Sequence, residues 1–174
     1  PAMAAADWNF YGSARMTTFV EIDDPPDPPG GGDADSDTDT TWTLQGNSRL
    51  GAKVKAGDIG GAFEFGVKGD SGSNGIYTRK LFGTYTFGDS QILVGQTYTP
   101  VSGMFYSNQV WGGDNDLLNA GQAYAGRRPM LRYKINGFQI ALVQPNTVSV
   151  DGLAGDVDVL LPKLELKYRL KQEM

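Results

Sequence analysis

The ionisable side chains of this chain limit the chemistry that it could perform. The sequence contains no histidine and no cysteine, the residues that most often act as general base, nucleophile or zinc ligand near neutral pH. Hydrolases built on a serine–histidine or cysteine–histidine pair are therefore excluded. The net charge of −5 argues against nucleic acid as a partner, because neutralising phosphates requires a surplus of Lys and Arg. We expect neither an enzyme nor a cofactor.

One acidic segment has the residue types that bind a hard cation. Asp33, Asp35, Asp37 and Asp39 alternate along the chain, so in an extended segment their carboxylates point to one side and could collect Ca²⁺, which prefers oxygen ligands. No EF-hand register fits, because the positions that require Gly and Glu carry other residues. Prolines and glycines precede the segment, which is typical of a solvated surface loop. These four residues are weak metal candidates.

The other concentration of charge is basic and follows a period of two residues. The apolar Leu164, Leu166, Tyr168 and Leu170 alternate with Glu165, Lys167, Arg169 and Lys171. The same alternation covers residues 7–22 and 42–56, with Arg15, Arg49 and Lys53 on the polar side. Such a period indicates β-strands with one apolar and one polar face. We therefore expect antiparallel strands whose polar face has a basic lining.

About eight strands are expected, and their connections have two lengths. Tight turns are predicted at Gly57-Asp58, Gly88-Asp89-Ser90 and Asn136-Gly137. They alternate with longer connections, of which the three longest cover residues 23–40, 101–128 and 146–161. Short turns at one end and long loops at the other are typical of outer-membrane β-barrels, with the long loops outside the cell.

The predicted fold is therefore all-β, an antiparallel transmembrane β-barrel whose strands and loops occupy residues 7–174. Residues 1–6 contain the small-x-small pattern of a signal-peptidase site and are expected to be a signal-peptide remnant or an N-terminal stub. Mean hydropathy is −0.33, a value compatible with barrel strands because these are apolar on one face only.

Several motifs resemble those of the Gram-negative trimeric general porins, in the family's order over roughly residues 7–145. They are Asn9-Phe-Tyr-Gly-Ser-Ala-Arg15, Asn47-Ser-Arg-Leu-Gly-Ala-Lys53, Phe82-Gly-Thr-Tyr-Thr-Phe-Gly88, Val94-Gly-Gln-Thr-Tyr-Thr-Pro100, Trp111-Gly-Gly-Asp114 and Gly126-Arg-Arg-Pro-Met-Leu-Arg-Tyr133. The resemblance implies a barrel of about 16 strands, of which this chain is the N-terminal half, with loop 101–128 folded into the lumen. It also implies a homotrimer, exported through the periplasm to the outer membrane, in contact with lipid and lipopolysaccharide.

The resemblance implies passive diffusion of small hydrophilic solutes and ions through a water-filled pore narrowed by loop 101–128. In this family, basic wall residues face acids of the third loop across the narrowest point. By motif match the wall residues are Arg49 and Arg127, the acids are Asp114 and Asp116, and Gln96 stands where the family typically has Arg. Residues that supplement the basic side are Arg128 and Arg132 at the constriction and Arg15, Lys53 and Lys80 in the lining. This surplus favours anions.

Three alternatives remain open at this point. A small eight-stranded outer-membrane barrel with a structural or adhesive role would have an interior filled by side chains and no aqueous channel. A soluble all-β binding module, such as a secreted calcium-dependent one, would place the basic face in water. A barrel phospholipase ranks last, because such chemistry normally relies on a serine–histidine pair.

Overall fold

The computed structural model describes residues 5–24, 29, 36–67, 75–102, 125–145 and 161–170. Within these ranges the chain forms strands and turns, and no helix in them is long and apolar enough to span a membrane. The strands are β1 (Asp7–Ser13), β2 (Met16–Asp23), β3 (Asp37–Leu44), β4 (Arg49–Ala56), β5 (Ile59–Val67), β6 (Ile76–Phe87), β7 (Ser90–Tyr98), β8 (Arg127–Ile135), β9 (Phe138–Val143) and β10 (Lys163–Tyr168).

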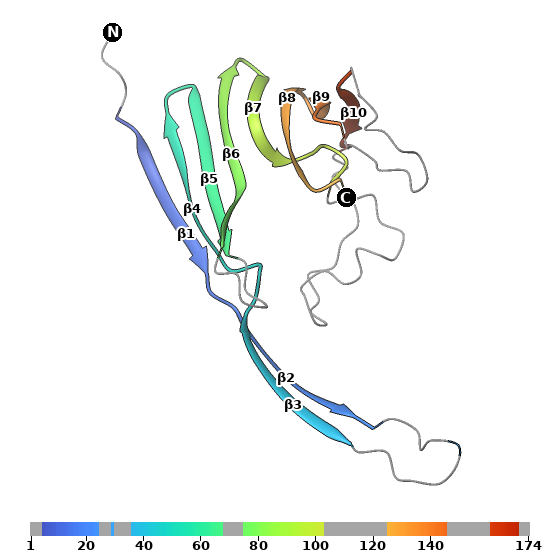
Figure 1. The fold of residues 1–174 in the computed structure, drawn as a ribbon. Helices are drawn as coiled ribbons and strands as arrows, with labels where there is room; N and C mark the ends of the chain where they lie inside the picture. Colours follow the sequence, from blue (N-terminus) through green and yellow to red (C-terminus); the bar gives the residue numbers. More distant parts are fainter. Residues whose placement is uncertain are drawn as a thin grey trace.

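Eight strands form one antiparallel sheet in the order β1-β4-β5-β6-β7-β8-β9-β10, and β2 and β3 form a separate two-stranded ribbon. The large sheet is strongly curved, and the ribbon extends beyond its end (Figure 1). β1 and β10 are the two edges of the large sheet and do not pair with each other among the described strands. The expectation of an antiparallel all-β fold is confirmed, and the described strands form an open sheet.

The expected tight turns connect β4 to β5, β6 to β7 and β8 to β9. Gly57 and Gly88 adopt φ of 59° and 52°, and the last turn has Asn136 at 43° followed by Gly137 at 84°. These left-handed values match the right-handed twist of the adjoining strands, and Asn and Gly adopt them at the lowest steric cost. The three predicted turns are therefore confirmed.

The prediction of continuous strands over residues 7–22 and 42–56 is wrong. The first segment is interrupted at residues 14–15, and residues 45–48 separate β3 from β4 in the second. Because the two interruptions differ in length, the ladder cannot continue in register, and the second half becomes the β2–β3 ribbon. Ser48 joins the two parts, since its hydroxyl accepts a hydrogen bond from the Arg15 amide at 2.9 Å and donates one to the Arg15 carbonyl at 3.2 Å.

Two long connections are shorter than expected. The connection predicted at residues 23–40 ends before Asp37, where β3 begins, and the connection predicted at residues 101–128 ends before Arg127, the first residue of β8. β3 and β8 thus begin earlier than the sequence pattern predicted. Their first residues show no clear alternation but pair with β2 and β7 respectively.

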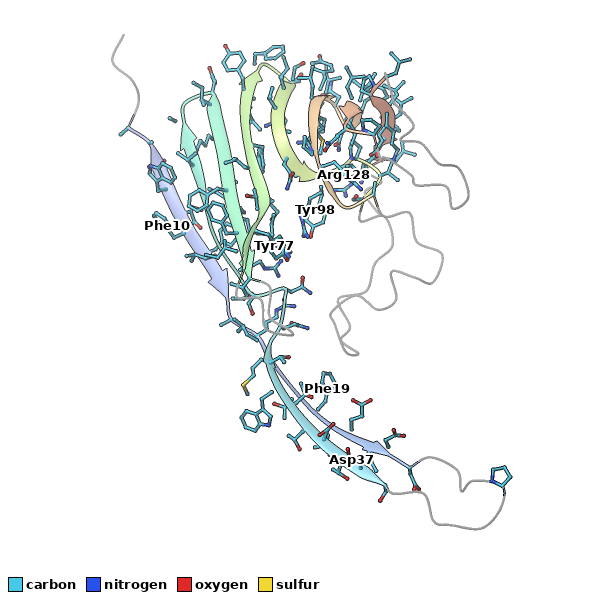
Figure 2. All side chains as sticks on the ribbon, viewed as in Figure 1. Phe10, Phe19, Asp37, Tyr77, Tyr98 and Arg128 are labelled. Carbon is cyan, nitrogen blue, oxygen red and sulfur yellow. The ribbon has the colours of Figure 1, made fainter. Side chains whose placement is uncertain are left out.

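The register gives the large sheet two chemically different faces, because residues directly opposite each other in an antiparallel ladder share a face. Lys53 pairs with Asn9 and Ala62, and Arg132 pairs with Leu93 and Ala141, so these residues belong to the concave face. The convex face is predominantly apolar. Figure 2 shows Phe10 on the outer side of the sheet and Tyr98 on the inner side. The buried apolar cluster is small and consists of Leu93, Met130, Ala141 and Val143.

Candidate functional site: the concave face

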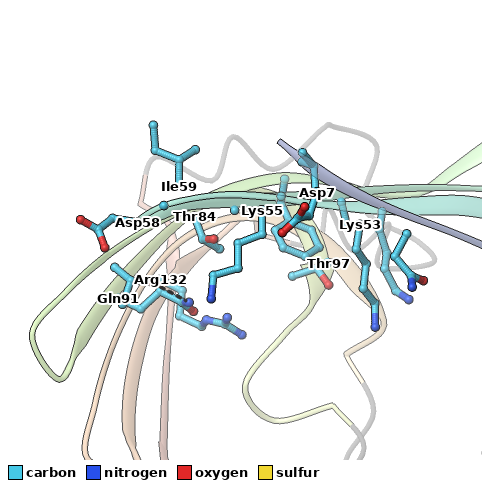
Figure 3. A pocket seen from close by; sticks show the side chains of 18 of the residues that line it. Asp7, Lys53, Lys55, Asp58, Ile59, Thr84, Gln91, Thr97 and Arg132 are labelled. Atoms are coloured by element: carbon cyan, nitrogen blue, oxygen red, sulfur yellow. Dashed lines mark hydrogen bonds between the residues drawn. The ribbon is translucent and has the colours of Figure 1, made fainter. Parts of the chain in front are cut away.

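A hollow of about 830 Å³ lies on the concave face. Figure 3 shows Lys53, Lys55, Gln91 and Arg132 directed into the space under the arched strands. The lining also includes Asn9, Tyr11, Lys80, Phe82, Thr84, Thr86 and Thr97. Strands distant in sequence, from β1 to β8, therefore contribute to one cavity, whose charged lining residues are four cations and two carboxylates.

The hollow exists because β5 contributes very small side chains to the concave face. Gly60 and Ala62 pair with Lys55 and Lys53, so the long lysine side chains lie next to residues with almost no side chain. A Cβ added at Gly60 would lie 2.7 Å from the Thr84 Oγ1 of the next strand. The glycine thus leaves the space open and lets β6 approach closely.

A buried carboxylate lies at one end of this hollow. Glu64 Oε1 accepts a hydrogen bond from Arg79 Nε at 2.7 Å, and Oε2 accepts bonds from Lys80 Nζ at 2.8 Å and Tyr11 Oη at 2.9 Å. The Glu64 side chain is only 1% exposed and the Arg79 side chain 2%. One carboxylate is thus saturated by two cations and a phenol, and its negative charge is compensated locally.

A β-bulge allows two consecutive residues to bind the same carboxylate. The register between β5 and β6 shifts at Glu64/Phe65, so that Glu64 pairs with Lys80 whereas Phe65 pairs with Thr78. Arg79 is the extra residue, and a bulge re-aims the side chain that it inserts. Its guanidinium also donates to Tyr77 Oη at 3.0 Å, which anchors the beginning of β6.

Arg127 and Gln96 make wall contacts close to this bulge. Arg127 donates to Tyr98 Oη at 2.9 Å and lies 5.1 Å from the centre of the Tyr98 ring, a cation–π geometry. Gln96 donates from its side-chain amide to the carbonyl of Thr78 at 3.0 Å, across the irregular strand pair. Gln96 therefore stabilises the bulge, a role that the sequence did not suggest.

A second buried carboxylate ties β10 to the residues that follow β7. The Glu165 side chain is 1% exposed, lies 2.9 Å from Lys163 Nζ and accepts a hydrogen bond from the Val101 amide at 3.1 Å. Ser102 then joins the two ends of the β7–β8 connection, because its hydroxyl donates to the Gly126 carbonyl at 2.9 Å and accepts from the Ala125 amide at 3.2 Å. Both ends are thus fixed to each other and to the sheet.

The predicted pore residues other than Arg127 and Gln96 divide into three groups. Lys53, Lys80 and Arg132 line one hollow; Arg49 and Arg128 belong to the same face by register. Arg15 lies outside the large sheet, in the link between β1 and β2, because the strand that was expected to carry it is interrupted there. Asp114 and Asp116 lie outside the described residues.

The weak metal candidates are not brought together by the described strands. Asp37 and Asp39 belong to β3 and pair with Asp23 and Glu21, whereas residues 33 and 35 lie outside the described ranges. Among the described residues there is no group of three His, Cys, Asp or Glu that could hold a metal ion. The pairing of like charges is unfavourable at this end of the ribbon.

Comparison of the chain with protein-family models, curated proteins and solved structures gave no match. The function is therefore inferred from the sequence motifs and from the two faces of the sheet.

Proposed function

We propose that this chain forms part of the wall of an outer-membrane diffusion pore. The convex face contacts lipid, the concave face contacts water, and small hydrophilic solutes and ions pass along the concave side. No bond chemistry is involved, and selectivity follows from the width and charge of the lining.

The observation that carries this proposal is the extent of exposed apolar surface on the convex face. Leu50 is 65% exposed, Val94 61% and Leu131 49%, and they belong to three different strands of one sheet. Further exposed residues on this face are Phe10, Leu81, Leu142, Leu164 and Leu166. Soluble monomers rarely expose contiguous apolar patches larger than a few hundred Å², so this face requires an apolar environment.

Aromatic side chains collect at the tight-turn end of the sheet. Tyr85 and Phe87 end β6, Phe138 begins β9, and Tyr168 ends β10; all four are exposed. At the start of β1, Trp8 stacks with Phe10, their ring centres 6.2 Å apart. Aromatic rings at one level of a sheet fit the aromatic girdle at a membrane–water interface. This supports a membrane orientation with the tight turns on the periplasmic side.

The open edges support a larger assembly. A small closed barrel requires β1 to pair with β10, which does not occur among the described strands. Exposed strand edges cannot face lipid, because their N–H and C=O groups would be unsatisfied. We therefore propose that further strands complete a barrel of about 16 strands, and that three such barrels associate in the outer membrane alongside lipid and lipopolysaccharide.

Single-channel recording from the native protein, extracted in detergent and added to a planar bilayer, tests the pore. The expected result is large ohmic conductance steps that close in three equal sublevels at high voltage. A folded, membrane-inserted protein that gives no conductance would refute diffusion. Conductance without sublevels of one third would refute the trimer alone.

A further inference from the structure

The cations of the concave hollow differ in whether a carboxylate already neutralises them. Lys80 is bound to Glu64 at 2.8 Å. Lys53, Lys55 and Arg132 form no ion pair with any residue that the structure describes. The hollow therefore retains three cationic side chains that no described carboxylate pairs with, of which Lys53 has its Nζ 5.7 Å from the centre of the Tyr11 ring.

The acids of this region cancel part of that charge, because Asp7 stands directly opposite Lys55 in the β1–β4 ladder. Glu64 is saturated by two cations and a phenol, so this cluster as a whole is positively charged and offers no free carboxylate to the hollow. Asp7 and Asp58 line the hollow as well, at the tight-turn end where β1 begins and β4 passes into β5. With Arg79 and Glu64 included, five cations (Lys53, Lys55, Arg79, Lys80 and Arg132) stand against three carboxylates (Asp7, Asp58 and Glu64), so the hollow and its Glu64 end keep a net positive charge.

Arg132 provides an unused directional donor. Its Nε is buried and has no hydrogen-bond partner in the described part of the chain, although buried donors are normally paired. Its neighbours in the ladder are Leu93 and Ala141, and the side chains of these two residues have no atom that accepts a hydrogen bond. The planar guanidinium presents its donors in a geometry that matches the oxygens of carboxylates and phosphates.

Neutral hydrogen-bonding groups surround these cations. Asn9, Thr84, Thr86 and Gln91 line the same space and can donate to oxygens that the cations do not reach. The volume of about 830 Å³ lies in the range of small-molecule sites, so the hollow accommodates a hydrated inorganic anion or a small organic one.

We infer that this hollow is a binding site for small multivalent oxyanions, with Lys53, Lys55 and Arg132 as the charged ligands. The inference rests on the proposed function, because it requires the concave face to be in contact with water. The site extends from the tight turns to Lys80, whose Nζ lies 5.8 Å from the centre of the Tyr98 ring, and Tyr98 is the partner of Arg127 at the start of β8. An anion would thus be concentrated at the wall of the proposed pore.

Equilibrium dialysis of radiolabelled inorganic phosphate against the native protein, extracted in detergent as for the conductance measurement, tests the site. The expected result is saturable binding that sulfate competes away and that weakens with ionic strength. Lys55→Gln and Arg132→Gln should each weaken binding about fivefold, the factor that one unit charge at about 4 Å contributes in water. Lys167→Gln, on the concave face of β10 outside the hollow, is the matched control and should leave binding unchanged.

Absence of saturable phosphate binding by the folded wild-type chain, or an equal loss in the Lys167→Gln control, would overturn the inference. Conductance of the same preparation is measured separately and distinguishes the two proposals. A conducting pore without phosphate binding would contradict the anion site and leave the pore intact. Phosphate binding by a protein that inserts but does not conduct would contradict the pore and leave the site.

Discussion

Replacing Glu64 with Gln should destabilise the folded chain by about 3 kcal/mol. The substitution keeps the shape of the side chain and removes its charge. Arg79, which is 2% exposed, then has no counter-charge at 2.7 Å, and Lys80 loses its partner at 2.8 Å.

The magnitude follows from the burial of the two cations. Removing one partner of a buried ion pair costs about 3–5 kcal/mol, mainly because the remaining charge is desolvated without compensation. The lower end applies here, because the Lys80 side chain is 22% exposed and can turn towards water. The Gln amide oxygen also retains one hydrogen bond to a cation, worth about 1.5 kcal/mol.

Reversible unfolding in guanidinium chloride, with the protein in lipid vesicles and tryptophan fluorescence as the signal, measures this cost. The double variant Glu64→Gln/Arg79→Met removes both buried charges and should recover about 2 kcal/mol relative to additivity. Glu21→Gln, on the exposed β2–β3 ribbon, is the control and should change stability by less than about 0.5 kcal/mol. A cost below about 1 kcal/mol for Glu64→Gln, or strict additivity of the double variant, would refute the buried ion-pair reasoning.

Three further substitutions test other parts of the structure. Val94→Lys, on the convex face, should destabilise the membrane-inserted state by about 2–4 kcal/mol. Thr84→Lys, on the concave face, should destabilise it by less than about 1 kcal/mol. Equal free energies of unfolding for the two variants would contradict the assignment of faces. Gly95→Ala should lower the free energy of unfolding by at least about 2 kcal/mol, because φ at this position is 125° and a Cβ would collide with the backbone of β6. Gly88→Ala has open space around it and should lower the free energy of unfolding by only about 1 kcal/mol. A lower denaturant midpoint for Gly88→Ala than for Gly95→Ala would count against this packing. Ser48→Ala should raise amide hydrogen exchange in β2 and β3 but not in β5, since only the hydrogen bonds that join ribbon and sheet are lost; uniform exchange changes would argue against this local role.

The two faces and the tight turns could be predicted because they depend on local rules. A period of two residues fixes which side chains share a face, and Asn136-Gly137 selects its turn through backbone conformations that few other residues adopt. Lys53 and Arg132 were both assigned to the polar face, and the register places them in one hollow. Both residues line the same cavity because the β5 residues between them are small, and the alternation pattern carries no information about the size of those residues.

The Glu64 cluster was missed because a bulge changes the alternation. Simple alternation along β6 puts Arg79 with Leu81 and Tyr85 on the apolar face, where a charged residue is out of place. That anomaly was the available signal of an inserted residue. The interrupted strands gave no such signal, because the alternation of apolar residues continues from Phe10 to Met16 across the break at residues 14–15. The ladder ends there only because the break in the facing segment, residues 45–48, is longer.

The account depends most on the claim that one face contacts lipid and the other water, and accessibility of single cysteines tests it directly. The chain has no cysteine of its own. Cysteines can therefore be labelled without background at Val94, Leu131 and Leu142 on the convex face, and at Lys53 and at Lys134, the ladder partner of Gln91, on the concave face. In lipid vesicles, fluorophores at the first three positions should be quenched by nitroxide lipids, and the last two should react with a membrane-impermeant thiol reagent. Equal access of the water-soluble reagent to both groups, with no quenching by lipid, would contradict a membrane-embedded pore wall.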